Sequence, residues 1–319
     1  MGKCVVLGEK IMNNQLVVSI CIPTKKRVDI VRETLKSLLS QDADKTLYEI
    51  CISDNSETDE TKNLIEKEFS DVPNLYYRKS DCQGFLNSIE ALKLGNGKLL
   101  KLHNDYSKFK PGALREIINV SQKYGDKSGV IFFAMGTIDG PKNISEHEDF
   151  DSFLNFISYM STWSSAFSIW KKDMEKLIED NIQVDSMFPH TTLLFSLTGK
   201  EQYIVDNHEY VESIPLKKKG GYNLIDNFVR IYLTMVHSLL IDKSITQQTY
   251  DKIENGIIKF CAYWYALVKT NPNLTFSFEN KEKLISKQCG NWAVYRFSIY
   301  FYLYYYPKAI LRKLIKVNN

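Results

Sequence analysis

Apolar residues in the first part of the chain alternate between two spacings. Val17–Ile22 is a β-branched run closed by Pro23, whereas Val28–Ser40 repeats apolar residues at helical spacing. The same cycle recurs, which predicts strands at 17–22, 48–53, 74–78, 98–102 and 130–134 and helices at 28–40, 58–69, 84–94 and 111–124. Strands that alternate with helices predict a mostly parallel sheet that helices cover on both faces. Ligands of such sheets bind beyond the carboxyl ends of the strands.

The alternation stops after Gly140. Helical spacing follows, and it predicts helices at 150–160, 174–180, 224–240, 253–268 and 281–287. The basic, glycine-containing stretch Leu216–Gly221 is the best candidate for a domain boundary. We therefore expect a first domain of residues 1–215 and a helical C-terminal region of residues 222–319.

The composition is that of a folded globular protein. Of its 319 residues, 44% are hydrophobic and 25% are charged, which excludes a largely disordered chain. The net charge of +3 and the lack of an RNA-binding motif argue against nucleic acid as a partner. The six cysteines have no zinc-ligand spacing, which predicts free thiols in a reducing cytoplasm. Residues 1–15 contain no apolar stretch long enough for a signal peptide.

Polar residues follow four of the predicted strands. These strand ends are Pro23–Arg27, Ser53–Ser56, Ser80–Asp81 and His103–Asp105. Neither a GxGxxG fingerprint nor a GxxxxGK[ST] phosphate loop is present, which excludes dinucleotide oxidoreductases of the Rossmann type and P-loop enzymes. The chemistry of this chain is therefore expected in acidic and charged loops at one edge of the sheet.

The order of these segments carries a family resemblance. Ser19–Thr24, Ile50–Asp59, Leu102–Asp105 and Lys110–Leu114 together resemble the family 2 glycosyltransferases, and most of all the bacterial O-antigen and capsule sugar transferases of the abequosyltransferase kind. The resemblance covers roughly Val17–Thr198. It implies an α/β fold of the GT-A type, Rossmann-like and mostly parallel, with a C-terminal helical appendage.

The resemblance also implies an activity. The expected reaction is an inverting transfer of a sugar from a nucleotide-diphosphate donor to a hydroxyl of a glycan or lipid-linked saccharide, during assembly of a bacterial surface polysaccharide. The rival interpretation is a catalytically silent GT-A-like nucleotide-binding or scaffold subunit. The sequence leaves the donor, the acceptor and the oligomeric state open.

The nucleotide is expected at the first three strand ends. The resemblance implies that Asp54 accepts a hydrogen bond from the base and that Asp81 is a second carboxylate on the nucleotide side. Pro23–Thr24 and Arg27 are candidates for contacts with the base, the ribose or the diphosphate. Two plainer interpretations stay open, because Asp54 can cap the following turn with Ser56 and the charged loop can simply be solvated.

A divalent cation commonly binds the diphosphate in this family, through a DxD pair of carboxylates. This chain departs from that pattern, because His103–Asp105 contains one carboxylate only. Asp105 is the best candidate metal ligand, and His103 would favour Mn²⁺ over Mg²⁺ because nitrogen ligands suit softer ions. Alternatively, His103 is a hydrogen-bonding histidine at a strand end.

The acceptor side is expected late in the first domain. Asp185, just before the apolar run 191–197, is the candidate general base, and His190 is the alternative. Asp185 can instead be an acid that complements a helix dipole. The acceptor loop of the family is matched by Trp163, Ser164 and Ser165. The indole can stack on a sugar ring or belong to the core.

The C-terminal tail, residues 292–319, combines aromatic and basic side chains and has no acidic residue. This pattern predicts peripheral attachment to anionic lipid at the inner face of the bacterial cytoplasmic membrane. Arg296, Pro307 and Lys308 interrupt the apolar run, so a membrane-spanning helix is not expected. The alternative is a helical appendage that packs on the core or makes an oligomer contact.

Overall fold

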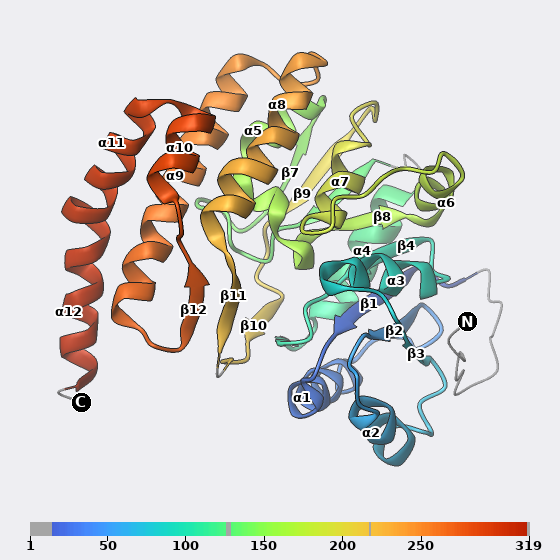
Figure 1. Ribbon diagram of the computed structural model, residues 1–319. Coiled ribbons are helices and arrows are strands. Elements are labelled where there is room, and N and C mark those ends of the chain that lie inside the picture. Colours follow the sequence, from blue (N-terminus) through green and yellow to red (C-terminus); the bar gives the residue numbers. More distant parts are fainter. Residues whose placement is uncertain (1–14, 126–128, 217, 318–319) are drawn as a thin grey trace. The chain divides into compact units, whose positions relative to one another are not determined.

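The computed structural model describes residues 15–125, 129–216 and 218–317 (Figure 1). The amino-terminal segment in which we expected no signal peptide lies almost wholly outside the described residues, and so does Cys4. The chain divides into two compact units. The first unit consists of the residues up to Phe153 and of Met160–Pro215. The second unit consists of Leu154–Tyr159 and of the residues from Leu216 onward.

The first unit is built on a five-stranded sheet. Its strands lie in the order β3 (Leu75–Lys79), β2 (Tyr48–Asp54), β1 (Val18–Thr24), β4 (Leu99–Leu102) and β8 (Ser168–Trp170). The first four are parallel and β8 is antiparallel to β4. Every residue of β2 is buried, as expected for a strand covered on both faces. The predicted α/β organisation is confirmed.

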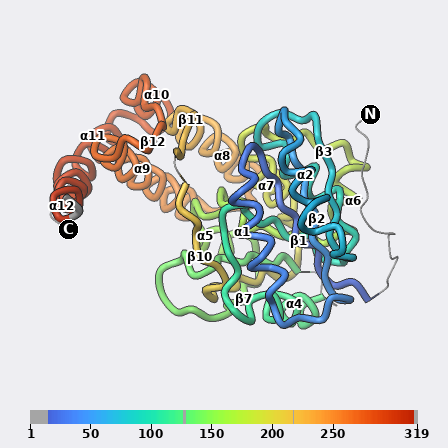
Figure 2. The backbone as a smooth tube through the Cα atoms, turned by 90° about the horizontal axis from the view of Figure 1, so that it is seen from below, coloured from blue at the N-terminus to red at the C-terminus, as the bar shows by residue number. Residues whose placement is uncertain are grey.

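Four helices connect or flank these strands close to their predicted positions. They are α1 (Val28–Leu39), α2 (Glu60–Glu68), α3 (Asn87–Leu94) and α4 (Ala113–Gly125). In α1 the buried residues Val31, Leu35 and Leu38 follow the helical period and form the face that packs inward. Helix α1 packs against α2 (Figure 2), and α3 packs against β1 and β2. A single 3₁₀ turn, Gly84–Leu86, leads into α3, so the helix begins three residues later than predicted.

The strand alternation does not stop at Gly140, which corrects the prediction. Strands β7 (Ile144–His147), β9 (Tyr203–Asp206) and β10 (Val211–Ser213) follow it, besides β8. They pair with two earlier strands: the three-stranded sheet has the order β6 (Val130–Phe133), β9, β7, and β10 pairs with β5 (Ser107–Phe109). Strand β6 pairs with β9 and does not continue the large sheet, although a bridge joins Phe132 to Phe167. Strands of three or four residues are too short to show a period. The sequence therefore does not reveal β5, β7, β9 and β10, whereas the wholly apolar β6 appears where it is predicted, at 130–134. The helices between them are α5 (Phe150–Ile157), α6 (Lys171–Glu179) and α7 (Pro189–Phe195).

The second unit is mainly helical, as predicted, with two unpredicted strands. Its helices are α8 (Leu233–Ile241), α9 (Gln247–Thr270), α10 (Lys281–Cys289), α11 (Asn291–Ile299) and α12 (Tyr306–Val317). Strands β11 (Lys219–Asn223) and β12 (Leu274–Ser277) pair in parallel. The ring of Tyr265 in α9 contacts the rings of Phe278, Phe297 and Phe301 at centroid distances of 4.9, 5.9 and 4.7 Å. This aromatic cluster holds the last helices to α9.

A π-helical stretch, Tyr300–Tyr305, joins α11 to α12. The three segments together run from Asn291 to Val317. Even so, no helix among the described residues combines the length and the apolar character that crossing a bilayer demands.

Candidate active site

The parallel register gathers three of the predicted strand ends at one edge of the large sheet. Thr24, the last residue of β1, lies opposite Asp54, the last residue of β2. Strand β4 ends on the other side of β1, where the backbone N–H of His103 donates to the carbonyl of Cys21 at 2.8 Å. Residues far apart in the chain therefore meet where a ligand of such a sheet binds.

Asp105 is held from several directions. Its Oδ2 accepts a hydrogen bond of 2.7 Å from the Thr24 hydroxyl, and its Oδ1 forms an ion pair of 2.7 Å with Nη1 of Arg27. The Thr34 hydroxyl, from α1, donates to its backbone carbonyl at 2.6 Å. The side chain is only 2% exposed. Burial raises the pKa of Asp105, while the Arg27 charge and the Thr24 hydroxyl act in the opposite direction.

His103 points into the protein and stacks on Phe109 at a centroid distance of 4.3 Å. Its Nε2 lies 2.8 Å from the carbonyl oxygen of Ser107. Burial, with the nearby Lys101 charge, lowers the pKa of His103 to about 3, so the ring is neutral at pH 7. The Nδ1 atom is buried without a hydrogen-bond partner in the described structure.

These residues do not fit a divalent cation. Asp105 is the only carboxylate of the His103–Asp105 segment, and both of its oxygens already accept hydrogen bonds, one of them from a guanidinium. Among residues 15–125, 129–216 and 218–317, no group of three or more His, Cys, Asp or Glu side chains is placed to hold a metal ion. At phosphate sites Mg²⁺ is usually bound by one or two carboxylates together with the substrate phosphates, and the one carboxylate of this segment is already paired with a guanidinium.

Asp54 is completely buried at the end of β2. Its Oδ1 accepts hydrogen bonds from the backbone N–H of Ser56, at 2.9 Å, and from the Ser56 hydroxyl. Its Oδ2 accepts from the Tyr77 hydroxyl at 3.3 Å, and burial together with the Asp54 charge raises the pKa of that phenol. The turn cap that the sequence offered as an alternative is therefore present. The role in binding a base stays a prediction.

Asn87, which the sequence analysis missed, joins these strand ends. Its Nδ2 lies 3.1 Å from the carbonyl of Thr24, 2.8 Å from the carbonyl of Ser53 and 3.2 Å from Oδ1 of Asn55. Its Oδ1 accepts from the Ser53 hydroxyl at 2.7 Å. The one signal for it in the sequence is an asparagine near the start of a predicted helix, and nothing in the spacing shows that it faces two strands.

The predicted acceptor loop meets the end of β4. The Ser164 hydroxyl donates to Oδ1 of Asn104 at 3.0 Å, and the Asn104 backbone N–H donates to the Ser165 hydroxyl at 3.3 Å. The ammonium group of Lys101, fully buried in β4, donates to the Ser165 carbonyl at 3.0 Å. Burial lowers the pKa of Lys101 to about 7. The indole of Trp163 is half-buried and packs against the core of the large sheet, so part of it is used structurally.

The two candidate bases lie at the start of α7. Oδ1 of Asp185 accepts from the backbone N–H groups of Met187 and Phe188, each at 2.8 Å, which leaves Oδ2 for a further proton donor. His190 is buried, and its Nε2 lies 3.0 Å from the carbonyl of Thr162. Burial lowers the pKa of His190 to about 4. The half-buried Asp185 is thus better placed to take a proton than His190.

Two predicted residues stand apart. Asp81 is exposed in the loop after β3, and no hydrogen bond or ion pair of the described structure joins it to the other candidates. Pro23 lies in β1 opposite Ser53 and has only backbone to offer at the edge. The structure thus brings Thr24, Arg27 and Asp105 into direct contact, and it leaves Asp81 outside that network.

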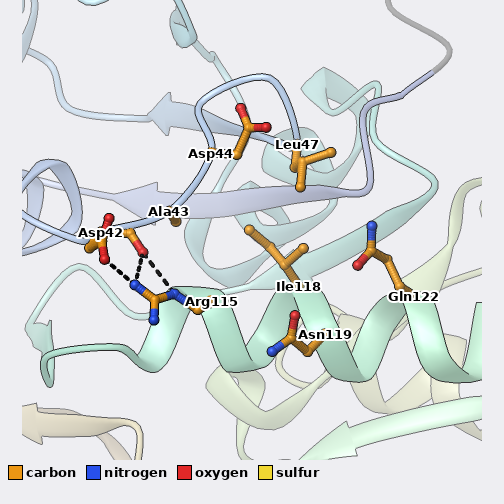
Figure 3. Close-up of a pocket in the computed structure, with 8 residues that line it drawn as sticks. All are labelled: Asp42, Ala43, Asp44, Leu47, Arg115, Ile118, Asn119 and Gln122. Carbon is orange, nitrogen blue, oxygen red and sulfur yellow. Dashed lines mark hydrogen bonds and ion pairs between the residues drawn. The ribbon is translucent and has the colours of Figure 1, made fainter.

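A cavity of about 270 Å³ opens at a different place on this unit (Figure 3). Its lining comes from the segment before β2 and from α4, and it consists of Asp42, Ala43, Asp44, Leu47, Arg115, Ile118, Asn119 and Gln122. Arg115 donates to the Asp42 carbonyl at 2.9 Å and pairs with its carboxylate. The cavity lies beside the start of β2, so it is at the edge of the sheet opposite the strand ends. None of the candidate residues lines the cavity.

Comparison with known proteins places these observations in a family. The family model described as glycosyl transferase family 2 matches residues 19–189, which is more than half of the 319 residues. Abequosyltransferase RfbV of Salmonella typhimurium is 35% identical over 85 residues, which are 26% of this chain and 26% of that protein. The aligned segment therefore spans about a quarter of the length of this relative.

Solved structures agree on the fold. The crystal structure of Staphylococcus aureus TarS 1–349 matches with a TM-score of 0.55 and 16% identity, over 90% of this chain and 81% of that one. Its complex with UDP-GlcNAc matches with a TM-score of 0.56 and 14% identity, over 90% and 82%. At such identities the likeness shows the fold alone, and it confirms the predicted GT-A type.

Proposed function

We propose, from the premise that this chain belongs to glycosyl transferase family 2, that it moves a sugar from a nucleotide-diphosphate donor to a hydroxyl of a glycan or lipid-linked saccharide. Family membership makes the chain a glycosyltransferase. The proposed setting is the assembly of a bacterial surface polysaccharide in the cytoplasm. The partial identity with an abequosyltransferase supports that setting.

The observation that carries the proposal is the meeting of Thr24, Arg27 and Asp105 beside Asp54 at the carboxyl ends of parallel strands. A nucleotide diphosphate needs an acceptor for its base and cations for its phosphates, and this edge supplies both. We assign the base to the turn that the buried Asp54 caps, with the backbone of Pro23–Thr24, and the diphosphate to Arg27. The exposed Asp81 is assigned to the ribose side, where a ligand can reach it.

On the acceptor side we propose an inverting displacement with Asp185 as the general base. Its Oδ2 takes the proton of the acceptor hydroxyl, the hydroxyl oxygen bonds to the anomeric carbon, and the bond from that carbon to the diphosphate breaks. Ser164 and the exposed part of Trp163 would line the acceptor, and the fully buried Ser165 would hold the loop behind them. The hydrogen bonds of Ser164 and Ser165 to Asn104 support this, since they fix the loop beside the end of β4.

The test is release of a nucleoside diphosphate from UDP-, GDP-, CDP- and dTDP-sugars in the presence of saccharide acceptors. We expect one donor class to turn over and Asp185→Asn to abolish turnover without loss of nucleotide binding. Asp180→Asn is the matched control, because Asp180 is an exposed carboxylate close by in the chain, at the end of α6. His190→Gln should keep the wild-type pH profile. Binding without turnover of any donor would favour the silent scaffold instead.

A second part of the proposal concerns the tail, within the second unit alone. One side of α11 and α12 packs on α9, while many large apolar side chains face solvent. The exposed ones are Trp292, Tyr295, Ile299, Tyr302, Leu303, Tyr304, Ile310, Leu311, Leu314 and Ile315. Aromatic and aliphatic rows with basic neighbours are typical of helices that lie in a lipid interface.

We propose that this face binds an anionic membrane surface. Residues 292–319 contain five basic residues and no acidic residue, so two copies packed through it would repel each other. Flotation with vesicles of phosphatidylglycerol and phosphatidylcholine tests this. We expect binding to the anionic vesicles, weakened by salt and by Leu303→Ser. Binding should be unchanged by Ile241→Ser, because Ile241 lies in α8 and is 66% exposed, close to the 69% of Leu303. Sedimentation as a dimer that Leu303→Ser disrupts, with no vesicle binding, would refute it.

A further inference from the structure

The loop between β1 and α1 carries three consecutive basic residues, which pair with two different acidic residues. The ammonium groups of Lys25 and Lys26 lie 3.4 and 2.7 Å from the carboxylate oxygens of Glu57, on the surface. Arg27 turns instead to the buried Asp105. One cation of the loop is therefore fixed at the edge of the sheet where the strand ends meet.

The guanidinium of Arg27 is held but not used up. One N–H group at Nη1 donates to Oδ1 of Asp105 at 2.7 Å, and the Tyr106 ring centroid lies 5.5 Å from Cζ. A guanidinium has five N–H donors, and in the described part of the chain the Arg27 side chain makes no other hydrogen bond. Since the side chain is 39% exposed, donors remain for a ligand that approaches from solvent.

We propose that Arg27 is the cation that binds the donor diphosphate, that Asp105 anchors it, and that donor binding needs no divalent metal ion. The inference rests on the proposed function. It assigns to Arg27 the positive charge that a metal ion usually supplies to the diphosphate in this family. It accounts for His103 and Asn104, because one carboxylate matches the single charge of a guanidinium, and while Asp105 holds Arg27 and Thr24 neither of its oxygens is free of a hydrogen bond. The planar fork of arginine also matches two phosphate oxygens at once.

The charge flow is complete without a metal ion. As the bond between the anomeric carbon and the diphosphate breaks, the electron pair stays on the leaving diphosphate oxygen. The N–H groups of Arg27 stabilise the negative charge that accumulates there, and the proton of the acceptor hydroxyl goes to Asp185. No step takes a proton from the guanidinium, which acts as a fixed positive charge.

Calorimetric titration of the full chain with UDP, GDP, CDP and dTDP tests the inference. Each nucleotide is titrated with EDTA, with Mg²⁺ and with Mn²⁺, and the matching monophosphates are titrated in parallel. We expect one diphosphate to bind equally well under all three conditions. Arg27→Gln should weaken that diphosphate about tenfold or more and leave the monophosphate unchanged, since a charge-assisted hydrogen bond to the second phosphate is lost.

Two further variants complete the design. Arg27→Lys keeps a positive charge beside Asp105, which protects folding, but it loses the fork, so an intermediate loss of diphosphate affinity is expected. Lys25→Gln removes a positive charge from the same loop, one that is paired with Glu57. It should not change the ratio of the affinities for diphosphate and monophosphate.

The outcomes separate this inference from the proposed function. A diphosphate that binds only with Mg²⁺ or Mn²⁺ overturns the inference and leaves the glycosyltransferase proposal intact. Equal weakening of monophosphate and diphosphate by Arg27→Gln overturns it as well, because the residue would then support the loop only. If no nucleotide binds under any condition, both fall together.

Discussion

Replacing Asn87 by aspartate tests how the edge of the sheet is built. The substitution keeps the size of the side chain and the oxygen that accepts from the Ser53 hydroxyl. It replaces Nδ2, which lies within 3.2 Å of oxygens from Thr24, Ser53 and Asn55, by another oxygen. The side chain is 3% exposed, so water cannot take over the lost contacts.

The expected loss of stability follows from these three contacts. The amide has two N–H groups, whose loss costs about 1 kcal/mol each, and a buried carboxylate facing these acceptor oxygens costs about 3–5 kcal/mol more. Together they predict that Asn87→Asp destabilises the chain by about 5–7 kcal/mol at pH 8. Protonation of the new carboxyl relieves part of this, because burial raises its folded pKa above its unfolded pKa. The loss should therefore grow as pH rises from about 4, at roughly 1.4 kcal/mol per unit, until the folded group ionises.

Urea denaturation of the full chain at pH 5 and pH 8, with the circular dichroism signal of the helices, measures the loss. Asn63→Asp is the control, because Asn63 is exposed in α2 and the same charge there should change stability by less than about 0.5 kcal/mol. A loss below about 1 kcal/mol that does not change with pH would show that Asn87 does not tie the strand ends together. Binding of the nucleotide should weaken in parallel, since Thr24 and Asn55 lose their support.

Three more predictions follow from buried groups and from a close approach of the backbone. Burial lowers the pKa of Lys101 to about 7 in the folded protein. The free energy of unfolding should therefore rise between pH 7 and pH 9 by roughly 2 kcal/mol more in the wild type than in Lys101→Met. Equal slopes of the unfolding free energy against pH, from urea titrations of the two proteins, would contradict the burial argument. Burial lowers the pKa of His190 to about 4. From pH 7 to pH 5 the unfolding free energy of the wild type should therefore fall by roughly 2 kcal/mol more than that of His190→Gln. An equal fall would mean that the ring is protonated in the folded protein. A Cβ on Gly97 would lie 2.7 Å from the backbone nitrogen of Ser19, so Gly97→Ala should destabilise the fold by about 1–3 kcal/mol. Gly199→Ala should be neutral, because a Cβ there would have no atom within 4 Å. Equal melting temperatures of the two variants would refute this prediction.

Much of the first unit could be predicted from the spacing of its apolar residues. The helix at Val28–Leu39 and the strand at Tyr48–Asp54 appear within a residue or two of their predicted bounds. The short strands β5 and β7 to β12 were not predicted, because most of them have no continuous apolar run such as Val130–Phe133, and their partners lie far along the chain. The end of β9 pairs with β6 more than seventy positions earlier, which no local pattern reports.

The sequence predicted the position of the candidate site, but it did not predict which side chains contact each other there. Polar strand ends could be found at Thr24, Asp54 and Asp105, since parallel strands bring their carboxyl ends to one edge. That Asp105 pairs with Arg27, 78 positions away, depends on how β1 and β4 lie beside each other. Asn87 was missed for the same reason.

The sequence by itself determined the alternation of strands and helices, the polar residues at the strand ends and the basic, aromatic tail. These features are local, because side-chain spacing along the chain fixes which face of an element is apolar. Only the tertiary structure decided that Arg27 neutralises Asp105, that Asn87 ties Thr24 to Ser53, and that Asp81 stays in solvent. Charge compensation and hydrogen bonding act through space over about 3 Å, and folding brings distant residues to that range.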